Sequence, residues 1–152
     1  MGYKKSHNDY WCERQIYTAL ANGCNIIEVD IIVLKDELIL SHQWVPHRLF
    51  GYGSLKNYIS FFNSYHGADS LYLLIELKTD NEKLLPLMIK YFSGFYNNNV
   101  TILIDAENKF LRKNAVRRAW EIIGSLSKNL YSPVLFWESW RQEKNIESID
   151  LF

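Results

Sequence analysis

The 152-residue sequence is short of cysteine, has no excess of charge of either sign and contains no long apolar run. Cys12 and Cys24 are its only cysteines, and their spacing fits neither a zinc knuckle nor a redox pair, so we expect buried or idle thiols. Seventeen basic residues balance seventeen acidic ones, whereas proteins that bind nucleic acid normally carry a basic excess. We therefore expect no nucleic acid among its partners.

The missing apolar run bears on membranes and on export. A helix that crosses a bilayer needs about 20 consecutive apolar residues, and no transmembrane segment of this kind is present. The opening MGYKKSHNDY is positively charged, but no apolar core follows it as in a signal peptide. We expect a cytoplasmic protein, or a secreted one if the N-terminus has been processed.

No repeat, low-complexity tract or linker rich in proline or glycine divides the chain. Its length is enough for one domain with its own core, and the 48% hydrophobic and 22% charged composition is typical of a globular protein. We expect a single domain over residues 1–152.

Extended and helical patterns alternate along the chain. The sequence predicts a nominal first strand near SHNDYW and further strands at residues 25–34, 37–42, 70–78, 100–106 and 132–137. It predicts helices at residues 13–21, 55–65, 81–96 and 109–126, with Ser54 as an N-cap and Pro86 delaying or kinking the third. This alternation indicates an α/β fold with a parallel sheet and right-handed crossovers.

The number of strand–helix units is about five, which is fewer than a complete barrel needs. A closed β/α barrel with eight units takes roughly 250 residues. We therefore expect either an open sheet or the first part of a TIM-type barrel. The tail at 138–152, ESWRQEKNIESIDLF, turns polar and predicts no sixth unit.

Two carboxylates interrupt the apolar strand NIIEVDIIVL. Side chains alternate between the faces of a strand, so Glu28 and Asp30 share one face, with Cα atoms about 6–7 Å apart. Burying both is costly unless a cation, basic side chains or protonation compensates. A hard divalent ion such as Mg²⁺ or Ca²⁺ suits a site made only of oxygens. The alternative is that both emerge into solvent at the strand end or pair with Arg.

The strand SLYLLIELK repeats this feature at its carboxyl end, where parallel α/β folds bind ligands. Glu76 and Lys78 share a face there. Glu76 is a candidate third metal ligand, and Lys78 suits an anionic substrate. The competing interpretation for Lys78 is a salt bridge to Glu76 or Glu28.

Two histidines are predicted near these acids. His42 ends the strand at 37–42, and His7 ends the first strand. Histidines beside a metal suit phosphoryl chemistry, in which one imidazole takes a proton from the nucleophile and the other protonates the leaving oxygen. His47 lies in a loop and His66 near a helix end, so we expect both at the surface.

The stretches SHNDYW, GCNIIEVDI, DELILSH and LLIELKT, in this order over residues 6–80, resemble the PI-PLC-like phosphodiesterase superfamily. That superfamily includes glycerophosphodiester phosphodiesterases. The resemblance is closest to the branch represented by altered inheritance of mitochondria protein 6. It implies a TIM-type barrel that cleaves phosphodiesters with one divalent metal ion, Mg²⁺ or Ca²⁺.

The resemblance also implies roles for particular residues. His7 and His42 would be the acid/base pair, and the ligands of the metal would be Glu28, Asp30 and Glu76. The residues that bind the substrate would be Lys78 and Asn8. Asp9 matches the motif beside Asn8, where capping or support of the site is an equal alternative to substrate contact.

Two hypotheses of function follow. The first is a metal-dependent phosphodiester hydrolase that acts on a glycerophosphodiester or a phospholipid-like substrate. The second is a non-catalytic, truncated relative that serves as a structural or partner-binding module. A different metal hydrolase on an open α/β sheet is a third option that spacing alone leaves open.

An open barrel would leave strand edges and apolar faces uncovered, so a homodimer of two partial barrels is a further hypothesis. The tryptophan-rich FWESW at residues 136–140 either lines a lipid or headgroup pocket or serves core and interface packing.

Overall fold

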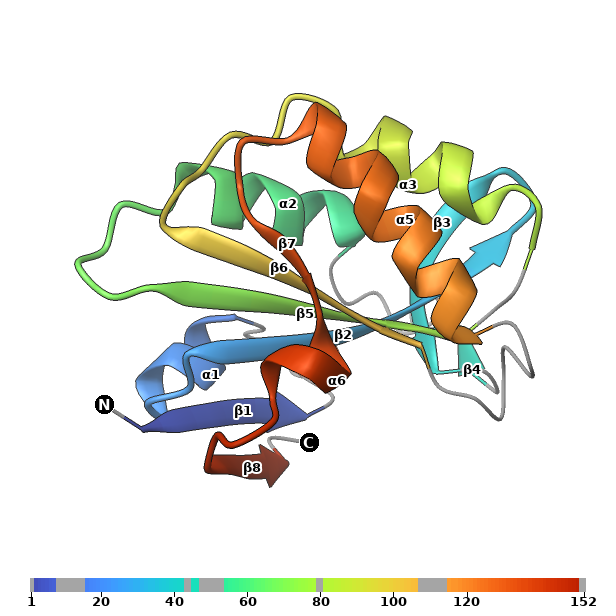
Figure 1. Ribbon diagram of the computed structural model, residues 1–152. Coiled ribbons are helices and arrows are strands. Elements are labelled where there is room, and N and C mark those ends of the chain that lie inside the picture. The colour runs from blue at the N-terminus through green and yellow to red at the C-terminus, as the bar shows by residue number, and fades with distance from the viewer. Residues whose placement is uncertain are drawn as a thin grey trace.

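The computed structural model describes residues 2–7, 16–42, 45–46, 54–78, 81–106 and 115–150. Strands and helices alternate along the chain (Figure 1). The strands are β1 (Tyr3–His7), β2 (Ile26–Leu34), β3 (Glu37–His42), β4 (Val45–Pro46), β5 (Leu71–Leu77), β6 (Val100–Ala106), β7 (Val134–Phe136) and β8 (Ile146–Asp150). The helices are α1 (Tyr17–Ala21), α2 (Leu55–Ser64), α3 (Leu84–Phe92), α5 (Ala115–Asn129) and α6 (Trp137–Trp140).

The strands form a mostly parallel sheet, which confirms the predicted α/β class. Its parallel strands run in the order β8-β1-β2-β5-β6-β7, and β3 pairs antiparallel with the second half of β2. The short β4 pairs only with β3 among the described strands. Within the described part of the chain, β7 and β8 lie at opposite ends of this order and do not pair, so the sheet is not closed.

The prediction that no sixth unit follows Trp137 is wrong. After α6 the chain forms β8, which pairs with β1 in parallel from Tyr3↔Ile146 to His7↔Asp150. The sequence pattern hid this strand because β8 lies at an edge, and none of its five residues is buried. Its polar composition therefore resembles a loop.

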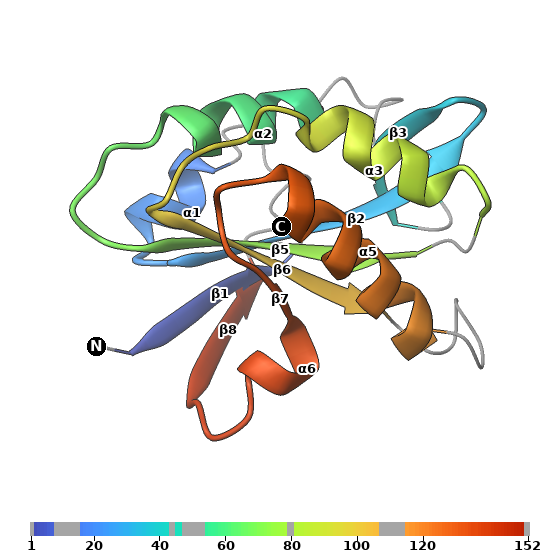
Figure 2. The same ribbon diagram turned by 45° about the horizontal axis from the view of Figure 1, so that its top comes forward.

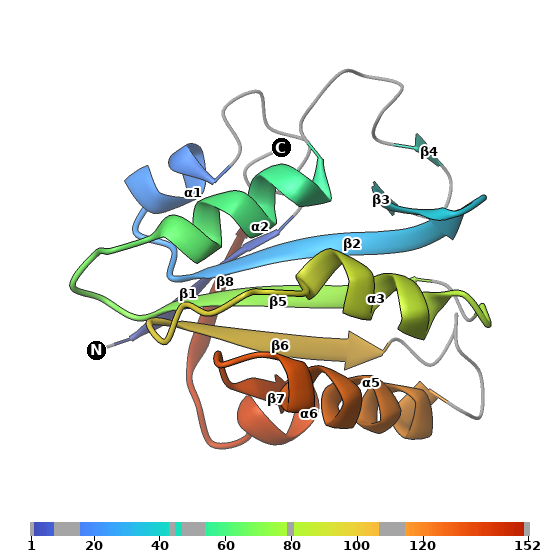
Figure 3. The same cartoon turned by 90° about the horizontal axis from the view of Figure 1, so that it is seen from above.

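Helices α2, α3 and α5 cover one face of the sheet, as Figures 1 and 3 show. The strand residues that point toward them are fully buried, including Val29, Ile75 and Ile104. The local signals read from the sequence are present: the Ser54 hydroxyl accepts a hydrogen bond from the Asn57 amide at the start of α2. Pro86 lies in the first turn of α3, where its missing N–H removes no helical hydrogen bond.

Helix α6 lies on the other face of the sheet (Figure 2). Strand β8 extends the sheet beyond β1 as an edge strand. A small apolar cluster lies on this side and contains Ile26, Leu74, Leu103 and Trp137. Further along β2 and β5 the residues on this face become charged. No helix among the described residues is long and apolar enough to cross a membrane.

The sequence assigns no functional site to the two cysteines or to His47 and His66. Cys24 is buried and His66 is exposed, both as expected. Cys12 and His47 lie outside the described residues.

Candidate functional site

Strand register brings acidic residues into one row across three neighbouring strands. Asp30 of β2 pairs with Glu76 of β5, and Glu76 pairs with Asp105 of β6. Glu28 precedes Asp30 by two residues and therefore shares its face of the sheet. Glu76 and Asp105 each lie one residue before the end of their strands, and Asp30 lies one residue before the parallel pairing of β2 with β5 ends. The repeated pattern in sequence thus becomes a single patch in space.

The carboxylates of Glu28, Asp30 and Glu76 converge. Each offers one oxygen atom, and these oxygens all lie within 4.8 Å of one another. Glu28 is 4% exposed and Asp30 is 2% exposed, so both are removed from bulk water. The alternative in which these two acids emerge into solvent does not occur. Buried acids at this separation repel one another unless positive charge compensates them.

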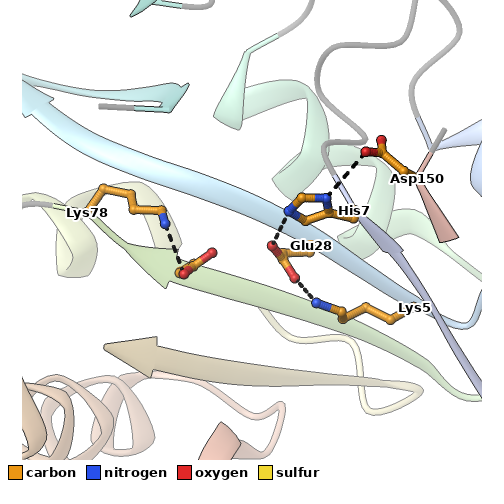
Figure 4. Close-up of polar contacts among 6 residues, drawn as sticks. Lys5, His7, Glu28, Lys78 and Asp150 are labelled. Atoms are coloured by element: carbon orange, nitrogen blue, oxygen red, sulfur yellow. Dashed lines mark hydrogen bonds and ion pairs between the residues drawn. The ribbon is translucent and has the colours of Figure 1, made fainter. Parts of the chain in front are cut away.

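Two lysines supply part of that charge. Lys5 of β1 pairs with Glu28, and the Lys78 Nζ lies 3.0 Å from Glu76 Oε1 (Figure 4). Lys78 is 6% exposed, so the salt bridge considered as its competing role is present in the structure. Asp30 and Asp105 lie beside these two pairs in the same row of residues across the sheet.

His7 lies at the border of the acidic patch. Its Nε2 is 3.8 Å from Glu28 Oε1, and its Nδ1 is 3.7 Å from Asp150 Oδ2 on β8 (Figure 4). The ring therefore sits between two carboxylates, one on either side. Its side chain is 46% exposed, whereas Glu28 is almost fully buried, so His7 is accessible from solvent while it faces the patch.

The position of the second predicted histidine is defined by its backbone only. β1 pairs with β2 as far as Ile27, and β3 pairs with β2 from Ile31 onward. The segment of β2 that contains Glu28 and Asp30 thus lies between the carboxyl ends of β1 and β3. His42 is the last residue of β3. The side chain of His42 lies outside the described part of the structure, as do Asn8 and Asp9.

Asp105 is a site residue that the sequence reasoning missed. Its pKa is raised to about 7, mainly by burial and then by the negative charges of Glu76, Glu138 and Glu28, in that order of importance. The signal was available, because VTILIDA has an apolar strand that ends in an acid, as IIEVD and LLIEL do. Lys5 was also missed, since a lysine in the opening MGYKK gave no indication of its partner.

A pocket of about 530 Å³ opens onto this patch. One wall contains residues already described, namely Lys5, His7, Glu28, Glu76 and Asp105. The other wall comes from α6 and from the turn that leads into β8, and contains Trp137, Glu138, Arg141, Lys144 and Asn145. Ile146 and Ser148 of β8 complete the lining. A small molecule in this pocket would contact the acids, His7 and the α6 segment together.

The donor set fits a divalent cation. Carboxylate oxygens are the ligands of Ca²⁺ and Mg²⁺. The three oxygens lie within 4.8 Å of one another, so Glu28, Asp30 and Glu76 could hold one such ion between them.

Comparison with known proteins points to a phosphodiesterase class. Residues 3–48 match the model of a family described as an AIM6-like phosphodiesterase domain, and this range contains His7, both acids of β2 and His42. The chain is also 26% identical over 136 residues to the "Altered inheritance of mitochondria protein 6 homolog" of Arthroderma benhamiae. That alignment covers 70% of this chain and 42% of the relative, so the chain spans less than half of the relative's length.

These two matches confirm the resemblance drawn from the sequence: the chain is similar to the AIM6-like branch of the phosphodiesterase superfamily. No solved structure matches the chain.

Proposed function

We propose that this domain is a metal-dependent phosphodiester hydrolase with a glycerophosphodiester or phospholipid-like substrate. One observation carries the proposal: three carboxylate oxygens within 4.8 Å of one another, in a patch that His7 borders. The match of residues 3–48 to a phosphodiesterase domain supports the same class of reaction.

The acids have the role of holding the cation. Glu28, Asp30 and Glu76 would bind one Ca²⁺ or Mg²⁺, which when bound supplies positive charge to the oxygens of the phosphodiester. Lys78 would fix the orientation of Glu76 through their 3.0 Å contact. Phosphate binding by Lys78 itself stays a prediction, and Lys5 is a second candidate because it lines the pocket.

His7 would transfer the proton. A general acid or base must reach the reacting group, and His7 lines the pocket with a partly exposed ring. Its contacts to Glu28 and Asp150 are longer than hydrogen bonds and would tighten, or be bridged by water, when substrate is bound. His42 would be its partner in the acid/base pair, and Asn8 would contact the substrate.

Hydrolysis of bis(p-nitrophenyl) phosphate and of glycerophosphodiesters tests the proposal. Activity is measured with Ca²⁺, Mg²⁺ or EDTA, for the wild-type chain and for His7→Ala. We expect EDTA to abolish activity and His7→Ala to lower kcat/KM by about 10²- to 10⁴-fold. The matched control is His66→Ala, which removes an exposed histidine that does not line the pocket and should leave kcat/KM unchanged.

The outcomes separate the two hypotheses of function. A folded chain that hydrolyses no diester with either metal would contradict the hydrolase and favour the partner-binding module. Activity that survives EDTA, or falls equally in His7→Ala and His66→Ala, would contradict the assigned site. The homodimer stays a prediction, for which light scattering after size-exclusion chromatography is the measurement.

A further inference from the structure

The wall of the pocket that faces the acids is built by a short segment at residues 137–146, which we call the α6 wall. It follows β7 and leads into β8, and it lies on the face of the sheet away from α2, α3 and α5 (Figures 1 and 2). It lies outside residues 3–48, the part that matches the phosphodiesterase family. The family match therefore assigns no role to the residues of the α6 wall.

The aromatic rings of the α6 wall are already in contact with cations of the chain itself. Trp137 and Trp140 stack with ring centroids 5.7 Å apart. The Arg141 guanidinium lies 5.9 Å from the Trp137 ring, and the Lys144 Nζ lies 4.5 Å from the Trp140 ring. A pocket for a quaternary ammonium needs indole faces that are open to the ligand. The α6 wall does not offer these faces to a cationic headgroup.

The two cations of the α6 wall are only weakly engaged by acids. Arg141 Nε is 3.9 Å from Glu138 Oε2, at the outer limit of an ion pair, and its side chain is 52% exposed. Lys144 donates to the Trp140 carbonyl oxygen at 2.5 Å, and among the described residues it makes no ion pair. Both side chains line the pocket, and both retain N–H donors for a ligand.

The two walls of the pocket thus differ in charge. On the first wall, which would hold the cation and the phosphate, the acids Glu28, Glu76 and Asp105 outnumber Lys5. On the α6 wall, Arg141 and Lys144 outnumber Glu138. A diester that spans the pocket would place its phosphate at the first wall and one of its alcohol groups at the second. Arg and Lys favour an anionic group at that position.

We propose that the α6 wall is a headgroup subsite for a phosphodiester whose alcohol carries a carboxylate or another anionic group. This inference rests on the proposed hydrolase function and names its class of substrate. Arg141 and Lys144 are the residues that determine specificity, and Asn145 provides a further polar contact at the same wall. The tryptophans support these two cations, so FWESW serves packing and lines the pocket at once.

The test compares two substrates that differ only in a carboxylate, glycerophosphoserine and glycerophosphoethanolamine. With Ca²⁺ present, we expect kcat/KM for the serine diester to be at least about 10-fold higher. The double variant Arg141→Gln/Lys144→Gln should lose this preference, because its kcat/KM should fall more for the serine diester than for the ethanolamine diester. The control Arg117→Gln/Lys128→Gln neutralises two charges of α5 that do not line the pocket, and should keep the preference.

The same carboxylate occurs in a free diester and in a phospholipid headgroup. Parallel assays with vesicles of phosphatidylserine and of phosphatidylethanolamine tell which source is used. A second readout does not depend on turnover: titration with phosphoserine in EDTA should change tryptophan fluorescence in the wild type and not in the double variant. Circular dichroism of the double variant checks that it is folded.

Failure of the subsite and failure of the hydrolase are distinguishable. Equal kcat/KM for the two diesters, or a preference that survives in the double variant, would overturn the subsite and leave the hydrolase standing. Absence of turnover for every diester, including bis(p-nitrophenyl) phosphate, would overturn the hydrolase. In that case the phosphoserine titration decides alone: a fluorescence change lost in the double variant supports the anion subsite, and no change in the wild type overturns it.

Discussion

The two faces of the sheet are made by alternate residues of the same strands, yet they carry different kinds of side chain. In β6, Ile104 is fully buried beneath the helices. Its neighbour Asp105 points to the opposite face, where burial and nearby acids raise its pKa to about 7. One residue contributes to stability through packing, whereas the other is held in an environment that disfavours its charge. Adjacent substitutions should therefore change stability in opposite directions.

The largest effect is expected on the helix-covered face. Ile104→Ala removes buried methylene and methyl groups and leaves a cavity, so we expect the free energy of unfolding to fall by about 3 to 4 kcal/mol. Urea denaturation measures this change. The proposed site is on the other face, so kcat/KM per folded molecule should stay close to the wild-type value. An unfolding free energy within about 1 kcal/mol of wild type would show that this face is less tightly packed than described.

A smaller effect of opposite sign is expected for Asp105→Asn in EDTA. The pKa of Asp105 is 3.8 as a reference value and about 7 in the folded chain, so wild-type stability is lost as pH rises between these values. Below pH 3.8 Asp105 is protonated in both the folded and the unfolded chain, so no stability is lost. At pH 8 the variant should be more stable by about 2 kcal/mol, and this gain should vanish near pH 4.

Thermal or urea unfolding across this pH range measures the gain. The matched control Asp69→Asn changes an exposed aspartate that does not line the pocket, and should show no such pH dependence. A variant that is less stable than wild type at pH 8 would contradict the view that the charged form of Asp105 is disfavoured.

The smallest effect on the free energy of unfolding is expected for the N-cap of α2, on the helix-covered side. Ser54→Ala removes the side-chain acceptor for the Asn57 amide at the start of α2, and should lower the free energy of unfolding by about 1 kcal/mol. Its control, Ser60→Ala, changes an exposed serine within the same helix and should cost less. Both should keep the wild-type kcat/KM. A fall in kcat/KM in Ser54→Ala would link this face to the site.

The parts of the molecule that the sequence predicted well share a physical reason. Buried parallel strands have continuous apolar runs, so β2, β5 and β6 were readable, and the acids that interrupt such a run stand out. Glu28, Asp30 and Glu76 were found this way, and the structure brings their carboxylates together. Asp105 carried the same signal, an acid near the end of an apolar run, and was overlooked.

The remaining features depend on long-range contacts that a linear pattern does not reveal. β8 has the composition of a loop and becomes a strand only because β1 offers a parallel edge. Asp150 thereby reaches His7, and the α6 wall reaches the pocket. Lys5 likewise gains its role from the pairing of β1 with β2, which places its ammonium against Glu28. Such partners are set by register, and register is visible only in the folded chain.

Calorimetric titration with Ca²⁺ and with Mg²⁺ tests most directly whether Glu28, Asp30 and Glu76 hold one cation. We expect a single site in the wild-type chain, with affinity at least about 10-fold weaker in Asp30→Asn and unchanged in Asp69→Asn. A wild-type chain that binds neither ion, or an Asp30→Asn variant that binds as tightly as wild type, would contradict this expectation.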